Sequence, residues 1–341
     1  MGTVKISKTD YLGWANCVKI SNGIVELIVT TDVGPRIIHY GFKGGPNHMK
    51  VFTDQAGKTG SDEWMSYGGH RIWHSPEEKP RTYDEDNFPC EWKKIENGIW
   101  TRAVMDPWTQ VEKEMEIVLD PTSSQVTINH RITNRNAWDV EFSVWCLTVM
   151  EAGGREIIPQ IIEGPELLPN RTLTLWTYSK MNDPRVTWLD KYIMLDQDTE
   201  ATTPFKIGLP VPAGWIAYAN FGQLFVKKFD FVEDADYPDF GLCSYETYTN
   251  NEMMELESLS PLWLVEPGDA IEHIEVWELH DNVEKPENEK EIDKMILPII
   301  QGKKKKEKTV EKKAENKVSK KVTKKETAGK KETKVKKVKG A

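Results

Sequence analysis

Runs that alternate between apolar and polar residues constrain the fold of this chain more than any other feature of its sequence. In segment 108–117, Val111, Met115 and Ile117 fall on one face of an extended chain and three glutamates fall on the other, which is typical of a half-solvated strand. Segment 125–132 alternates in the same way, and the continuously apolar segment 140–150 is typical of a central strand. Further strand-like runs are 192–195, 215–220, 224–229, 242–248, 253–259 and 271–279. This spacing predicts an all-β sandwich or barrel.

The N-terminal part begins with an expected β-hairpin. Segments 16–20 and 24–30 flank Asn22-Gly23, a dipeptide that favours a tight turn. A third strand is expected at 36–40, and Arg36 at its start is a candidate to face a pocket. Segment 41–89 is rich in Gly, Pro, Asp and Asn, so we expect long loops with short strand pieces, a length of loop that is usually functional.

Charge divides the chain into two regions. Residues 302–341 contain 18 lysines and five glutamates, a net charge of +13, so residues 1–301 carry −22 of the total of −9. We expect 1–301 to form one β-sandwich domain that ends in a helix beginning near Pro286, and 302–341 to be a disordered basic tail. The acidic body is a poor match for the phosphate backbone of nucleic acid, whereas the tail is a candidate to contact anionic surfaces.

Cysteine spacing and hydropathy favour a cytoplasmic protein. The four cysteines Cys17, Cys90, Cys146 and Cys243 are scattered without a CxxC pair, as expected of buried thiols in a reducing compartment. The N-terminus lacks the apolar region of a secretory signal, and no apolar run reaches the ~18–20 residues of a membrane span.

Segment 67–77 concentrates side chains that suit a polar pocket. They are His70, Arg71, Trp73, His74 and Glu77. The metalloprotease motif HExxH requires a helix, but here the two histidines lie between Gly-Gly and Ser-Pro, so we expect neither a metal ion nor another cofactor. We interpret His70 as a group that titrates near neutrality, Arg71 as a donor or carboxylate partner, and Glu77 as a partner or base. The alternative is a polar loop whose His and Arg satisfy buried carbonyl groups.

Glu255 and Glu257 form a second candidate cluster. In a strand they project from the same face, about 6.6 Å apart along the chain, while Met254 and Leu256 face the opposite way. Neighbouring carboxylates can separate each other's pKa values, which suits a base at neutral pH. The alternative is a solvated strand face, although the apolar residues that follow favour burial of at least one glutamate.

Several motifs, taken in order, resemble the galactose mutarotase-like (aldose 1-epimerase-like) superfamily, and more closely an uncharacterised bacterial branch of it. They are SNG (21–23), TDVGPRII (31–38), YGGHRIW (67–73) with Pro76-Glu77, DN (86–87), ITNRN (132–136) and ELESLSP (255–261). The resemblance covers residues 10–280. It implies a β-supersandwich whose concave face binds a carbohydrate, and a glutamate base and a histidine acid that open and reclose a sugar ring.

Carried onto this chain, the resemblance makes Glu257 the candidate base and His70 the best match for a substrate-binding histidine. The Glu-to-Pro spacing is one residue shorter than the family pattern, which leaves Glu255 in contention. Segment 143–148 reads SVWCLT and lacks the family's acid histidine, so His70 or His74 would have to supply the proton.

We therefore expect a carbohydrate-binding protein of the galactose mutarotase-like type, with aldose 1-epimerase-type isomerisation as its candidate activity and Glu257 and His70 as the candidate catalytic residues. The expected substrate-binding residues are Arg36, Arg71, Trp73, His74, Glu77 and Glu255. Two alternatives stay open. One is a non-catalytic sugar-binding or regulatory protein, and the other is a glycosidase or lyase that uses a carboxylate pair.

Overall fold

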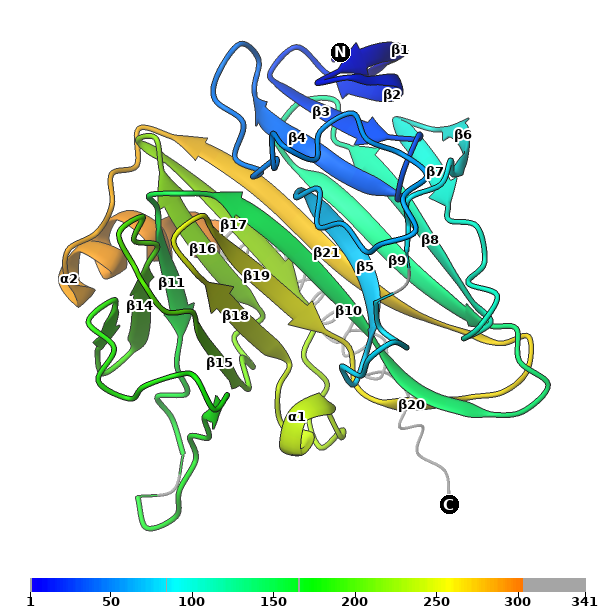
Figure 1. The fold of residues 1–341 in the computed structure, drawn as a ribbon. Helices are drawn as coiled ribbons and strands as arrows, with labels where there is room; N and C mark the ends of the chain where they lie inside the picture. The colour runs from blue at the N-terminus through cyan, green and yellow to red at the C-terminus, as the bar shows by residue number, and fades with distance from the viewer. Residues whose placement is uncertain (1, 84, 165, 303–341) are drawn as a thin grey trace, which may run out of the picture. The chain divides into compact units, whose positions relative to one another are not determined.

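Two antiparallel β-sheets packed face to face account for most of the chain up to Lys285 (Figure 1). The computed structural model describes residues 2–83, 85–164 and 166–302. The predicted all-β sandwich is thus confirmed.

The first sheet has 11 strands. In spatial order they are β1 (Lys5–Tyr11), β2 (Trp14–Ser21), β3 (Val25–Thr30), β4 (Arg36–Phe42), β5 (His70–Ser75), β10 (Val140–Glu151), β19 (Met253–Leu259), β18 (Tyr245–Thr249), β15 (Phe205–Leu209) and β12 (Thr174–Leu175), with β20 (Trp263–Val265) paired to β10. Figure 1 shows β5, β10 and β19 in front of the second sheet. The hairpin expected around Asn22-Gly23 is β2 and β3.

The second sheet has 10 strands. In spatial order they are β13 (Val186–Trp188), β14 (Tyr192–Asp196), β11 (Arg155–Pro159), β16 (Trp215–Asn220), β17 (Gln223–Phe229), β21 (Ala270–Asp281), β9 (Val126–Asn134), β8 (Val111–Leu119), β7 (Gly98–Arg102) and β6 (Glu91–Ile95). Strand β8 begins three residues later than expected, because Asp106 accepts the backbone N–H of Trp108 at 2.8 Å and folds the preceding residues into a turn.

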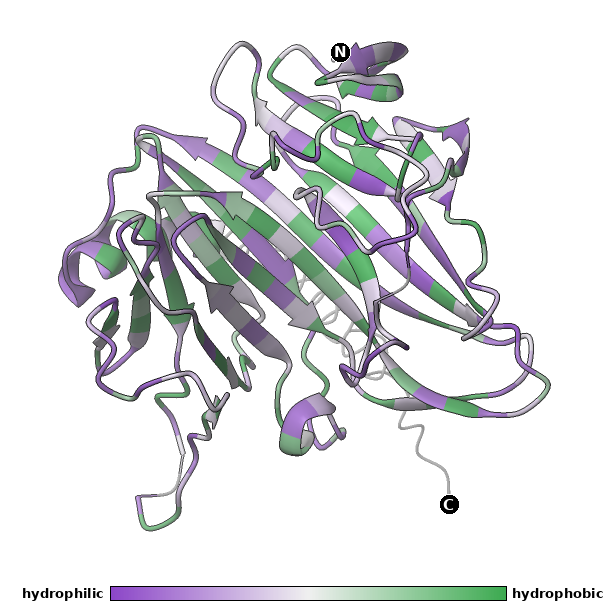
Figure 2. Cartoon of the chain, viewed as in Figure 1, coloured by the Kyte–Doolittle hydropathy of each residue, from purple (hydrophilic) through white to green (hydrophobic). Residues whose placement is uncertain are grey.

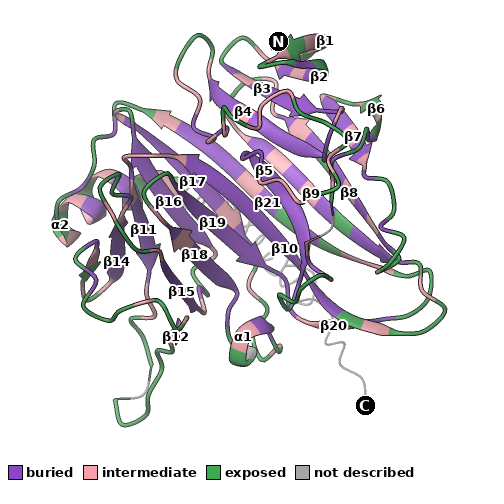
Figure 3. Cartoon of the chain, viewed as in Figure 1, coloured by how far each residue is buried: buried purple, intermediate pink, exposed green. Residues whose placement is uncertain are grey.

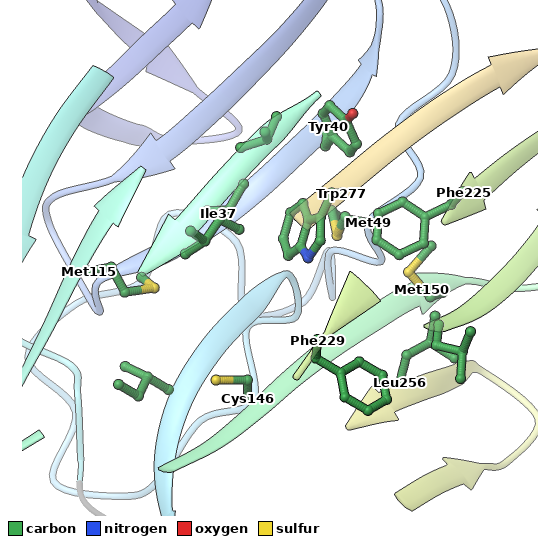
Figure 4. Packing of buried hydrophobic residues seen from close by; sticks show 14 of the residues in the cluster. Ile37, Tyr40, Met49, Met115, Cys146, Met150, Phe225, Phe229, Leu256 and Trp277 are labelled. Carbon is green, nitrogen blue, oxygen red and sulfur yellow. The ribbon is translucent and has the colours of Figure 1, made fainter. Parts of the chain in front are cut away.

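The hydrophobic core fills the space between the sheets (Figure 4). Cys146 and Leu256 come from the first sheet, and Met115, Phe225 and Trp277 come from the second. The strands show alternating hydrophilic and hydrophobic bands in Figure 2. In Figure 3 the central strands of the first sheet are buried along most of their length, so their outward faces are covered as well. Burial of each large apolar side chain stabilises the fold by about 1.5–3 kcal/mol.

Short helical segments lie outside the two sheets. A four-residue turn, α1 (Pro238–Gly241), in which Asp239 and Phe240 have positive φ, precedes β18, so this strand begins at Tyr245 and not at the expected residue 242. A separate unit starts at Pro286 and contains the expected helix, as α2 (Glu289–Glu291), the π-helical turn η1 (Ile292–Ile296) and further helix over residues 297–302, so Pro298 does not end it. Residues 303–341 of the expected basic tail lie outside the described residues.

The sequence also led to predictions about the cysteines and about membrane-spanning segments. All four cysteines are free and buried, as expected of structural thiols. Across the described ranges, none of the helices is both long and apolar enough to cross a membrane.

Candidate functional site

Strand alternation sorts the side chains of the first sheet onto two faces. Along β5, Ile72 joins the core between the sheets, while Arg71 and Trp73 line a cavity on the outer face of the same sheet. In the same way Cys146 of β10 packs in the core and Trp145 lines the cavity. The outer face is therefore the place where polar and aromatic side chains of the central strands converge.

This cavity, which we call the central pocket, has a volume of about 720 Å³. Its lining consists of Phe52, Asp54, Gln55, Trp64, Ser66, Arg71, Trp73, Glu77, Tyr83, Trp145, Leu147, Trp176, Tyr178, Pro204, Lys206, Tyr248, Glu252, Met253 and Glu255. Aromatic walls with a few convergent polar groups, in a volume between about 300 and 1,000 Å³, are typical of a site for a small ligand.

The register of the strands brings the charged residues together. Leu147 of β10 pairs with Arg71 of β5 on one side and with Glu257 of β19 on the other. Glu257 pairs in turn with Glu246 of β18. Since paired residues share a face of a sheet, residues far apart in the sequence form one row across the outer face.

Arg71 and Glu255 form a buried ion pair at the pocket. The Arg71 Nη2 atom donates to Glu255 Oε1 at 3.0 Å, and the side chains are only 3% and 10% exposed. The guanidinium also lies over the Trp73 ring, 4.5 Å from its centroid. No described protein group accepts from Arg71 Nε and Nη1 or from the ring N–H of Trp73, so this corner holds several donors that a ligand oxygen could satisfy.

Lys206 joins two further glutamates. Its Nζ atom is 2.7 Å from Glu246 Oε2 and 3.0 Å from Glu257 Oε2. The ammonium group also lies over the rings of Trp145 and Trp176, at 4.8 and 4.6 Å from their centroids. The two ion pairs and the two cation–π contacts together fix the position of this ammonium group.

Burial controls the titration of these groups. Burial raises the pKa of Glu257 to about 7, against the opposing effect of Lys206. Burial also raises the pKa of Glu246 well above its usual range, again opposed by Lys206. Although burial disfavours the charged form of Lys206, the two glutamates raise its pKa well above the ordinary value. The cluster therefore keeps its cation and can exchange a proton on a carboxylate near neutral pH.

Glu257 lies beneath the pocket rather than in its lining. Its side chain is fully buried, and Oε2 accepts from Trp145 Nε1 at 3.0 Å as well as from Lys206. Lys206, Trp145 and Glu255 line the cavity, but Glu257 does not. Both glutamates lie on the predicted face of β19, and Met254 and Leu256 lie in the core as expected.

His70 is not in the pocket. It lies on the core side of β5, where its Nε2 atom is 2.7 Å from His130 Nε2 and its Nδ1 atom is 2.8 Å from Thr148 Oγ1. His130 Nδ1 donates to the carbonyl of His273 at 2.9 Å, so His130 Nε2 is the acceptor for the His70 N–H. Burial lowers the pKa of His70 well below the ordinary range. The expected grouping of His70 with Glu257 is therefore absent, because the two side chains leave the sheet on opposite faces.

The core histidines surround Glu275. Its carboxylate accepts from Lys227 Nζ at 2.8 Å, from Ser258 Oγ at 2.6 Å and from Trp277 Nε1 at 2.7 Å. The donor atoms of His70, His130 and Glu275 lie within 4.8 Å of one another, as do those of Cys146, His273 and Glu275, which is close enough for a metal ion. The Lys227 ammonium already supplies the positive charge at Glu275, so this cluster is better explained as a polar network within the core.

The remaining predicted site residues fall into two groups. Glu77 lines the central pocket and accepts the hydroxyl of Tyr83. His74 lies on the core side of β5 against Phe142 and is absent from the pocket lining. Arg36 is also absent from the lining; its Nη1 atom donates to the carbonyls of Ser66 at 2.7 Å and Gly68 at 3.3 Å. Arg36 therefore holds the backbone of Ser66, which is itself a lining residue of the pocket.

The two glycines before His70 are required by close packing. A Cβ atom on Gly68 would lie 2.1 Å from the Lys50 carbonyl oxygen, and one on Gly69 would lie 2.4 Å from that of Ile37. Both residues also have positive φ, +92° and +71°. They fit the start of β5 against its neighbours and thereby set the positions of Arg71 and Trp73.

Comparison with solved structures identifies the fold. A galactose mutarotase-like protein from Clostridium acetobutylicum is similar at a TM-score of 0.51 and 7% identity, over 82% of this chain and 99% of that one. A galactose mutarotase-like protein from Lactobacillus casei is similar at a TM-score of 0.50 and 9% identity, over 78% and 100%. The fold is galactose mutarotase-like.

Larger proteins share this fold as well. A TPR-domain containing protein from Parabacteroides distasonis is similar at a TM-score of 0.52 and 12% identity, over 80% of this chain. The chain spans about half (49%) of that protein's length. The sequence matches no protein-family model, and no curated protein is similar to it in sequence. At these identities the mutarotase-like likeness establishes the architecture alone.

Sequence reasoning missed Lys206, Glu246 and most of the aromatic lining. Lys206 stands between Phe205 and Ile207 in β15, and a charge between two core residues of a short strand is the signal that could have been followed. Glu246 lies in a segment that was expected to be a strand, where alternation places it opposite to Tyr245. Neither signal reveals that the two residues meet at Glu257, because that depends on the order of strands in the mutarotase-like sheet.

Proposed function

We propose that the central pocket binds a carbohydrate. The observation that carries the proposal is the group of donors at Arg71 and Trp73, which no described protein group satisfies, set among the aromatic rings of Trp64, Trp145 and Trp176. A sugar ring presents apolar C–H faces to aromatic rings and hydroxyl oxygens to such donors. The mutarotase-like fold is compatible with this ligand class.

A second candidate function is aldose 1-epimerase-type isomerisation at the same site. It is favoured by the pKa of about 7 for Glu257, which suits a group that gives and takes a proton at neutral pH. Among the described residues that line the pocket there is no histidine. In this alternative Lys206, whose ammonium contacts Glu257 and lines the pocket, would stand in place of the histidine by stabilising negative charge on the sugar oxygen while it keeps its own proton.

NMR on a panel of aldoses separates these functions. Saturation transfer reports binding, and exchange spectroscopy reports interconversion of the anomers. We expect binding of at least one sugar. Anomer exchange that the protein accelerates and Glu257→Gln abolishes would establish the isomerase, whereas binding without acceleration would establish a binding protein.

The matched control is Glu272→Gln, an exposed glutamate of β21 that pairs with Arg131 on the surface. It should leave binding and exchange unchanged. Chain scission of an oligosaccharide would instead favour the glycosidase or lyase alternative. If no member of the panel binds, the carbohydrate proposal is wrong.

A further inference from the structure

A second cavity lies beside the central pocket, and Tyr83 lines both. Its volume is about 600 Å³, and its walls come from segments 80–83, 85–88 and 103–108. Its apolar lining includes Phe88, Val104, Met105 and Trp108. We call it the outer groove. Because Tyr83 is common to both linings, the two cavities are neighbours.

The outer groove exposes apolar side chains that are normally covered. Phe88 is 47% exposed, Val104 is 63% exposed and Trp108 is 64% exposed. Several such residues in one concave place mark a binding groove more often than single exposed residues do. Trp108 is also held in place, because Asp106 Oδ1 accepts its backbone N–H at 2.8 Å and the Asp106 carbonyl accepts the N–H of Gln110 at 2.9 Å. The indole is thus presented from an ordered turn.

The charges of the outer groove restrict its ligand. Its charged lining residues are Glu85, Asp86 and Asp106, and the described lining contains no lysine or arginine. Asp86 is neutralised by Arg36 at 2.9 Å, while the other two keep the groove acidic. An acidic wall repels phosphorylated, sulfated and uronic ligands. Flat aromatic and apolar surfaces without a basic group fit neutral sugar rings, which stack through their C–H faces.

We propose that the outer groove binds the outer units of a neutral oligosaccharide whose terminal sugar occupies the central pocket. This inference rests on the proposed carbohydrate function and adds the ligand's length and charge. The shared residue Tyr83 places the outer groove next to the central pocket, which supports one ligand that reaches across both. The central pocket holds the charged groups that select a terminal sugar, and the outer groove adds affinity through aromatic contact.

The test uses an array of neutral glycans in which each sugar is present as a monosaccharide and as chains of two to four units. Affinities of the hits are then measured by calorimetry for the wild-type chain and for Trp108→Ala. We expect the wild type to bind the longer chains about tenfold more tightly than the monosaccharide, the scale of one or two aromatic contacts. Trp108→Ala should remove most of that gain and leave monosaccharide affinity unchanged.

Trp138→Ala is the matched control. Trp138 is also 64% exposed but lines neither cavity, so its replacement should preserve the preference for longer chains. Equal affinity for all lengths in the wild type, or equal loss for short and long chains in Trp108→Ala, would overturn the outer-groove proposal while leaving the sugar pocket intact. Absence of any sugar binding would overturn both proposals. If the outer groove instead bound an apolar peptide in preference to every glycan, the oligosaccharide proposal for this groove would be wrong.

Discussion

The ammonium group of Lys206 lies 3.0 Å from the carboxylate of Glu257, and only Lys206 of the two lines the central pocket. A sugar would therefore meet the cation first and the glutamate second. The pair also has a structural role, because Lys206 is 6% exposed and Glu257 is fully buried. Removal of one partner leaves the other charge in the interior without compensation.

Lys206→Met should therefore destabilise the fold. Loss of one partner of a buried ion pair typically costs about 3–5 kcal/mol, and here Glu246 and Glu257 both lose their cation. The loss should be largest near pH 8 and smaller near pH 5, because both carboxyl groups have raised pKa values and become neutral as the pH falls. Urea denaturation at the two pH values measures the difference.

Lys228→Met is the control for this experiment. Lys228 pairs with Glu278 at 3.0 Å, but its side chain is 22% exposed, so the cost should be about 1 kcal/mol or less. Similar losses for the two variants would show that the Lys206 cluster has no special dependence on its buried cation.

Alternation predicted part of this site, and strand order determined the rest. The common face of Glu255 and Glu257 follows from a period of two along one strand, as does the burial of Met254 and Leu256 in the core. The segment around Arg71 was interpreted as a loop, so its histidines and its arginine were assigned to one site. As strand β5 it divides them, with Arg71 at the pocket and His70 in the core.

The contact between Lys206 and Glu257 could not be predicted from the sequence. Lys206 of β15 reaches Glu257 of β19 past the intervening strand β18. A single sequence contains the pattern of each strand but not the pairing of distant strands, because register is set by the whole buried face. Trp176 and Tyr178 lie near the short strand β12 and gave no periodic signal at all.

Glu156 provides a test of stability against pH. It is buried in β11, accepts the hydroxyl of Tyr245, and burial raises its pKa to about 8. The native state thus keeps a proton on Glu156 between about pH 4.5 and 8, where the unfolded chain has released it. The unfolded state binds fewer protons in that window, so this group lowers the free energy of unfolding by about 1.4 kcal/mol per pH unit as the pH rises.

Glu156→Gln should remove this dependence. The amide keeps an acceptor for Tyr245 but has no proton to lose, so the variant should match the wild type near pH 5 and exceed its stability at pH 9 by on the order of 4 kcal/mol. Denaturation curves at both pH values are the measurement. A difference between the two proteins that stays constant with pH would show that Glu156 does not titrate in this way.

Arg71 and His74 lie on opposite faces of strand β5, so substitutions at these two positions test which face binds the sugar. Arg71→Lys keeps a positive charge near Glu255 but loses the planar fork, and with it the Nε and Nη1 donors that no described group satisfies. Affinity for the best sugar of the panel should fall by roughly tenfold or more, the scale of one lost hydrogen bond to a charged group. His74→Leu should leave that affinity unchanged, because His74 is on the core side and absent from the pocket lining.

Titration calorimetry on both variants decides the point, with circular dichroism to verify that each is folded. An equal loss of affinity in the two would mean that the sugar is not bound by the outer face of β5. A loss in His74→Leu alone would place the ligand on the side of Phe142. The expected pattern is a loss of affinity in Arg71→Lys alone. This pattern requires a ligand that contacts the outer face of β5, because odd and even positions of one strand point their side chains to opposite faces.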